Sequence, residues 1–85
     1  MEKTVKIGRY DDSGLHLEWY HGFEISVTES QGEVVIRANE AGLISLAQHL
    51  LTLAEHAVPA GSHIHMDASR ELEDGSLDLV LERTA

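Results

Sequence analysis

The residues best suited to chemistry in this sequence are three alternating side chains, His63, His65 and Asp67. Successive side chains of a β-strand point to opposite faces, so these three would project from one face, neighbours lying about 6.5–7 Å apart. Neutral imidazoles and a carboxylate are ligands for zinc and other divalent metals. A complete site also needs a fourth or open position and groups that orient the ligands, and the sequence locates neither. Polar residues on an exposed strand produce the same spacing, so we predict no metal and no cofactor, with these three residues as the alternative metal ligands.

The remaining histidines and the serines do not form a recognisable catalytic motif. His49 and His56 are seven positions apart on a predicted helix, or about 10 Å, which is too far to share a metal, and we interpret both as exposed. No serine lies in a G-x-S-x-G context, and no G-x-x-x-x-G-K loop follows a predicted strand. The sequence therefore predicts a protein that is not an enzyme.

Charge is the most informative property of the composition. The 85 residues include 15 acidic and 6 basic side chains, a formal net charge of −9, and no cysteine. Nucleic acids and anionic membranes are bound by clustered Lys and Arg, whereas the basic residues here are scattered along the chain. We therefore expect no direct nucleic-acid or membrane contact, and a cytoplasmic protein that attracts basic partners.

The elements that must position these residues follow from hydrophobic periodicity. Alternation of apolar and polar residues predicts strands near 4–7, 15–20, 23–28, 34–36, 63–67 and 77–82. We expect a tight hairpin at His21–Gly22, because Gly accepts the left-handed position of such turns, and another turn at residues 30–32. A period of 3.6 predicts a helix from about Asn39 to Ala57. The expected fold is a single α+β domain, residues 1–85, of order ββββαββ. We predict one antiparallel sheet of five to six strands with the long amphipathic helix packed on one face.

Local signals define the predicted helix. Asn39 is a favourable N-cap, and Pro59 cannot continue a helix. We expect Leu46, Leu50 and Leu53 to be among the most buried residues. The polar helix residues are expected on or near the solvent side: Ser45, Gln48, His49, Thr52, Glu55 and His56.

One helix covers one face of a sheet, so the other face remains open to solvent or to a partner. Because side chains alternate between the two faces of a sheet, the polar strand residues are expected on that open face. The partner-binding candidates are these and the acidic residues of the connection Arg70–Gly75: His16, Glu18, Tyr20, His63, His65, Asp67, Glu71, Glu73 and Asp74.

Three segments of the C-terminal half carry a family resemblance. They are a Gly42-Leu43-x-x-Leu46-Ala47-x-x-Leu50 helix, a Pro59-x-Gly61-x-His63-x-His65 segment, and Gly75-Ser76 before the last strand. From Asn39 to Glu82 the chain resembles the predicted immunity proteins of bacterial polymorphic toxin systems, in the group numbered thirty-two. The resemblance implies a cytoplasmic protein that binds and neutralises a cognate toxin, for example a nuclease, without catalysis. A homodimeric accessory protein, or a metal-binding domain using His63, His65 and Asp67, are the alternatives.

Overall fold

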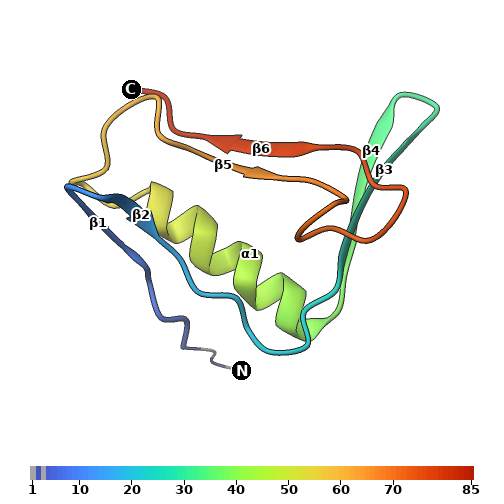
Figure 1. Ribbon diagram of the computed structural model, residues 1–85, viewed down its shortest axis with the longest axis horizontal. Helices are drawn as coiled ribbons and strands as arrows, with labels where there is room; N and C mark the ends of the chain where they lie inside the picture. The colour runs from blue at the N-terminus through green and yellow to red at the C-terminus, as the bar shows by residue number, and fades with distance from the viewer. Residues whose placement is uncertain (1, 3) are drawn as a thin grey trace.

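Among the described residues, the fold consists of one helix flanked by three two-stranded antiparallel ribbons (Figure 1). The computed structural model describes residues 2 and 4–85. β1 (Arg9–Asp11) pairs with β2 (Gly14–His16), β3 (Ile25–Ser30) with β4 (Glu33–Ala38), and β5 (His63–Met66) with β6 (Leu79–Glu82). The helix, α1, spans Glu40–Leu53 between β4 and β5. The α+β class and the order ββββαββ are confirmed, but the first strand is β1 and not the predicted segment 4–7, which has no strand structure. The helix is also shorter than the sequence predicted.

The prediction of one sheet with five or six strands is wrong. The three ribbons share no strand ladder among the described residues, and the expected hairpin at His21–Gly22 does not pair β2 with β3. Residues 17–24 instead run beside α1 without strand structure (Figure 1). The period-two pattern correctly predicted the alternation of burial along β5 and β6, but it does not specify which backbone groups pair.

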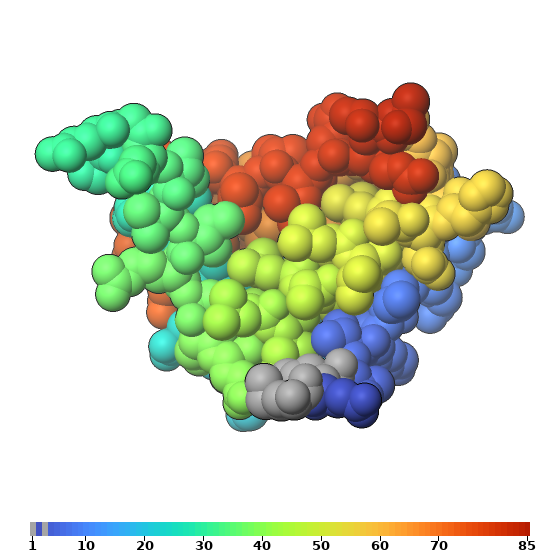
Figure 2. Space-filling model, turned by 180° about the vertical axis from the view of Figure 1, so that it is seen from behind, coloured from blue at the N-terminus to red at the C-terminus, as the bar shows by residue number. Residues whose placement is uncertain are grey.

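The β3–β4 hairpin projects from the rest of the molecule (Figures 1 and 2). Gln31 and Gly32 at its tip have φ values of 53° and 82°. Two consecutive left-handed residues form the turn that matches the twist of paired strands. The turn that the sequence predicted around residues 30–32 is therefore confirmed.

Asn39 fixes the N-terminal end of α1, as its residue type predicted. Its Oδ1 accepts from the backbone N–H of Gly42 at 2.8 Å and of Glu24 at 3.0 Å, and its Nδ2 donates to the Gly22 carbonyl at 2.9 Å. Gly42 allows a close approach here, because a Cβ atom on it would lie 2.6 Å from the Glu24 carbonyl oxygen. One cap residue thus ties the helix to the chain that enters β3.

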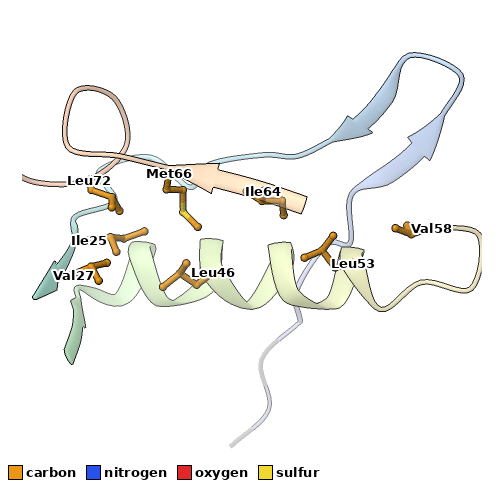
Figure 3. Packing of buried hydrophobic residues seen from close by; sticks show 8 residues of the cluster. All are labelled: Ile25, Val27, Leu46, Leu53, Val58, Ile64, Met66 and Leu72. Carbon is orange, nitrogen blue, oxygen red and sulfur yellow. The ribbon is translucent and has the colours of Figure 1, made fainter. Parts of the chain in front are cut away.

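The hydrophobic core lies between α1, β3, β5 and the segment that follows β5 (Figure 3). Leu46 and Leu53 point from the helix toward Ile64 and Met66 of β5 (Figure 3). In the part of the chain that the structure describes, eight apolar residues are buried: Ile25, Val27, Leu46, Leu53, Val58, Ile64, Met66 and Leu72. The prediction that Leu50 is among the most buried residues is wrong, since its exposed fraction is 54%.

The buried side of α1 carries a row of polar residues, Ser45, Gln48 and Thr52, in addition to its apolar residues. Ser45, Gln48 and Thr52 are 0% exposed, although their polarity predicted the solvent side. The Oγ of Ser45 accepts from Tyr20 N, Oε1 of Gln48 from Glu18 N, and Oγ1 of Thr52 from Gly8 N, at 2.8–2.9 Å. A buried backbone N–H without a partner is costly, and these three belong to residues outside the strands. The polar row turns inward because it supplies these acceptors.

We predict that Thr52→Val lowers the free energy of unfolding by about 1–3 kcal/mol, because it leaves the partly buried Gly8 N–H without an acceptor. Thr52 Oγ1 also donates to the Gln48 carbonyl at 2.6 Å. Thr52→Ser retains the hydroxyl and is the matched control, with a smaller loss. Urea denaturation measures both. Equal stability of the Val variant and the wild type would contradict this role.

Candidate partner-binding surfaces

The histidines of β5 project away from the core, as their alternation predicted. Ile64 and Met66 are buried, whereas His63 and His65 are exposed. His65 Nε2 lies 3.3 Å from Asp78 Oδ2, and His63 Nδ1 donates to the Gly61 carbonyl at 3.2 Å. Both side chains are therefore accessible from outside the molecule while held by neighbouring groups.

Asp67 does not join the two histidines, because its carboxylate is used within its own loop. Oδ1 accepts from the Ser69 N–H at 2.9 Å and from the Ser69 hydroxyl at 2.5 Å, and Arg70 Nε lies 3.6 Å from Oδ2. The Ser69 hydroxyl bond is the main cause that lowers the pKa of Asp67. Across residues 2 and 4–85, no three potential metal ligands lie together.

The second group of predicted residues lies on the N-terminal segment, which covers a different side of α1. His16 is half-buried on β2. Glu18 pairs with Lys6 at 3.0 Å, and Tyr20 is half-buried where its N–H meets Ser45. Because β2 and β5 belong to separate ribbons, the structure does not place the two groups on one continuous sheet face.

A serine, a histidine and an aspartate meet at the β1–β2 turn. Ser13 Oγ donates to Asp11 Oδ1 at 2.7 Å, and His16 Nε2 lies 2.9 Å from that oxygen and 2.8 Å from Ser13 Oγ. These bonds, that from the Ser13 hydroxyl foremost, lower the pKa of Asp11. A catalytic relay uses one imidazole nitrogen for the nucleophile and the other for the carboxylate. Here a single nitrogen contacts both, so the cluster stabilises the turn and does not activate Ser13.

The acidic residues of the predicted loop have two different environments. Glu73 and Asp74 are exposed, whereas Glu71 is half-buried and its Oε1 is enclosed without a hydrogen-bond partner. The loop is attached to the edge of β3, where Glu73 N donates to the Ile25 carbonyl at 2.8 Å. Glu73 and Asp74 are thus accessible acids on an anchored loop, and Glu71 is partly enclosed.

Two features of α1 were not recognised from the sequence. His49, interpreted as exposed, is 0% exposed and its ring meets that of Trp19 edge-on at 4.3 Å between centroids. In contrast, Leu43 and Leu50 are 56% and 54% exposed. The exposed leucines could have been expected from the composition of α1. Its apolar residues occupy a wider stripe than a helix needs to pack against a single layer.

Comparison with known proteins identifies the family. Residues 33–84, which include β4, α1, β5 and β6, match the family model described as Immunity protein 32. No curated protein and no solved structure shows significant similarity to the chain. Within the described residues, no helix is long and apolar enough to cross a bilayer. The family match covers more than half of the chain and confirms the resemblance found in its C-terminal half: the chain belongs to the Immunity protein 32 family.

Proposed function

We propose that this protein binds and neutralises a cognate bacterial toxin by protein–protein contact, with no catalytic step of its own. Membership of the Immunity protein 32 family is the observation that carries this proposal. The turn cluster of Asp11, Ser13 and His16 lacks the geometry of a catalytic relay, which supports a role in binding. The cytoplasm, where a toxin would reach its target, is the proposed compartment.

The charge of the chain supports a basic toxin as the partner. A net charge of −9 attracts basic proteins and raises their association rate. Nucleases bind the phosphate backbone of their substrates with Lys and Arg, so an acidic protein is suited to cover such a site. We therefore propose a nuclease as the toxin class.

The exposed polar groups described above have the properties of an interface rim. Glu73 and Asp74 are accessible acids on a loop anchored to β3, and His63 and His65 project from β5. Charges at a rim mainly affect the association rate and its dependence on salt. Tyr20, half-buried on the segment that follows β2, is a candidate aromatic anchor.

Co-expression with the toxin encoded beside this gene tests the proposal. We expect the wild-type protein to protect the cells and to bind the purified, catalytically inactivated toxin. Charge reversal of Glu73 and Asp74 together should slow association at low salt, and this difference should disappear at high salt because exposed charges are screened. His65→Ala and Tyr20→Ala test β5 and the segment of residues 17–24 separately, with melting temperatures recorded as controls for folding.

A wild-type protein that neither protects against the neighbouring gene product nor binds it would contradict the immunity function. A homodimeric accessory protein is the alternative in that case. Light scattering on the wild-type protein measures its oligomeric state directly.

A further inference from the structure

The helix presents an apolar side to solvent. Because Ser45, Gln48 and Thr52 face the N-terminal segment, the positions on the opposite side of α1 point outward. Leu43, Leu50 and Leu51 have exposed fractions of 56%, 54% and 45%. We name this side the outer face of α1, and it consists of Leu43, Ile44, Ala47, Leu50, Leu51 and Ala54.

Shallow depressions extend the outer face at both of its ends. At the N-terminal end, Leu43 and Ala47 line one with Val5 and Glu40. At the C-terminal end, Leu50 and Ala54 line another with Val80 of β6, which is itself 51% exposed. Figure 2 shows α1 crossing the centre of this side of the molecule, between β6 and the N-terminal segment.

The continuity of this surface distinguishes it from ordinary exposed residues. Single apolar side chains on a surface are normal, whereas a contiguous apolar patch with a polar rim is typical of an interaction site. The core does not require these leucines, because α1 reaches it through Leu46 and Leu53. The outer face is therefore an apolar surface without a partner among the described residues.

Acidic residues lie at the two ends of the outer face and along β6, and they indicate the occupant. Glu40 lies in the first turn of α1, Glu55 just beyond its last turn, and Glu82 on β6 beside Val80. The nearby Arg83 guanidinium donates to the carbonyls of Leu53 and Glu55. In a two-fold dimer the same patch meets itself, so two acidic rims would face each other. A partner with an apolar centre and a basic rim complements this surface.

From this arrangement we infer that the outer face of α1 is the docking surface for the toxin, through an apolar patch with a basic rim on that protein. The inference rests on the proposed function. It assigns the central contact to the helix, with the histidines of β5 and the acidic loop outside that contact. The leucines supply the buried centre of the interface, and Glu55 and Glu82 increase the rate of encounter.

Polar substitution of the outer face tests the inference with purified, inactivated toxin. Leu43→Gln and Leu50→Gln should each raise Kd by about tenfold or more, because central contacts carry most of the binding energy. Gln is a good helix former, so the melting temperatures should remain close to that of the wild type. Val34→Thr is the matched control, because Val34 is 63% exposed but lies on the projecting hairpin. It should bind as the wild type does.

The outcomes separate the inference from the proposed function. If the wild type protects and both leucine variants bind with unchanged Kd, the inference is wrong and the immunity function stands. If the wild type neither protects nor binds, the immunity function fails and the inference fails with it. A wild-type dimer that Leu50→Gln converts to a monomer, with toxin binding unaffected, would assign the outer face to a second copy and overturn the inference.

Discussion

Leu46→Ala is expected to lower the free energy of unfolding by about 2–5 kcal/mol, the usual cost of truncating a leucine in a packed core. Leu46 is 8% exposed and belongs to the cluster between α1 and β5 (Figure 3). A domain of 85 residues has a total stability near the lower end of about 5–15 kcal/mol. A loss at the upper end of this range removes the whole stability of the domain, and a loss at the lower end lowers its melting temperature.

Leu50→Ala provides the matched control, because it is the same substitution one helical turn away. Leu50 is 54% exposed, and Ala is a better helix former than Leu, so stability should change by less than about 0.5 kcal/mol. Chemical denaturation followed by circular dichroism measures both variants. Similar losses of stability for the two would mean that the helix is rotated relative to this structure. If the docking inference also holds, the two substitutions have different effects: Leu46→Ala lowers stability, and replacement of Leu50 weakens toxin binding.

The features that the sequence predicted correctly depend on local chemistry. Asn39 caps α1 because its side chain reaches an N–H three residues ahead. Gln31 and Gly32 form the hairpin turn because Gly readily adopts positive φ. In β5, Ile64 and Met66 turn inward because side chains alternate along a strand. Each of these outcomes is decided within a few residues of the signal.

The features that the sequence did not predict depend on contacts between distant segments. Residues 17–24 resemble a strand in their periodicity, but their backbone groups find acceptors on α1 instead of a neighbouring strand. Glu18 N, for example, donates to Gln48, which is 30 positions away. This contact rotates the polar row of α1 inward and leaves Leu50 outside. Helical periodicity alone located the leucine stripe but did not determine which part of it is buried.

The candidate site was predicted correctly where it depends on one strand and incorrectly where it depends on the pairing of distant strands. His63 and His65 are exposed on one strand, as expected. The common sheet face that would have united them with His16 and Tyr20 is absent, because β2 and β5 belong to different ribbons. The outer face of α1 could be identified only from the structure, because it is the side of the helix opposite the buried polar row.

The second large effect that we expect is a loss of stability in mild acid, caused by His49. The side chain is 0% exposed, and neither ring nitrogen has a hydrogen-bond partner among the described residues. Burial lowers the pKa of His49 from its ordinary value of 6.5, and the negative charge of Glu71 partly opposes this shift. The uncharged ring of Trp19 contacts the His49 ring edge-on and provides no charge that would stabilise the protonated imidazole. The folded protein therefore favours the neutral imidazole.

The direction of the pH effect follows from this lowered pKa. In the unfolded chain His49 takes up a proton as the pH falls through about 6.5, whereas in the folded protein it remains neutral until a lower pH. Between these two values the unfolded state binds more protons, so stability decreases as the pH falls, by up to about 1.4 kcal/mol per pH unit. The aspartates with lowered pKa, Asp11 and Asp67, start from 3.8 and act at lower pH.

His49→Leu removes the titrating group from the core while keeping an apolar contact with Trp19. We expect this variant to be at least as stable as the wild type at pH 7.5, because a buried polar group without a partner is costly. Between pH 7 and 5.5 it should lose less stability than the wild type, as measured by urea denaturation. His56→Gln is the control, because His56 is exposed near the end of the same helix and its replacement leaves His49 buried. An equal loss of stability in the wild type and His49→Leu over this interval would show that another group causes the acid sensitivity.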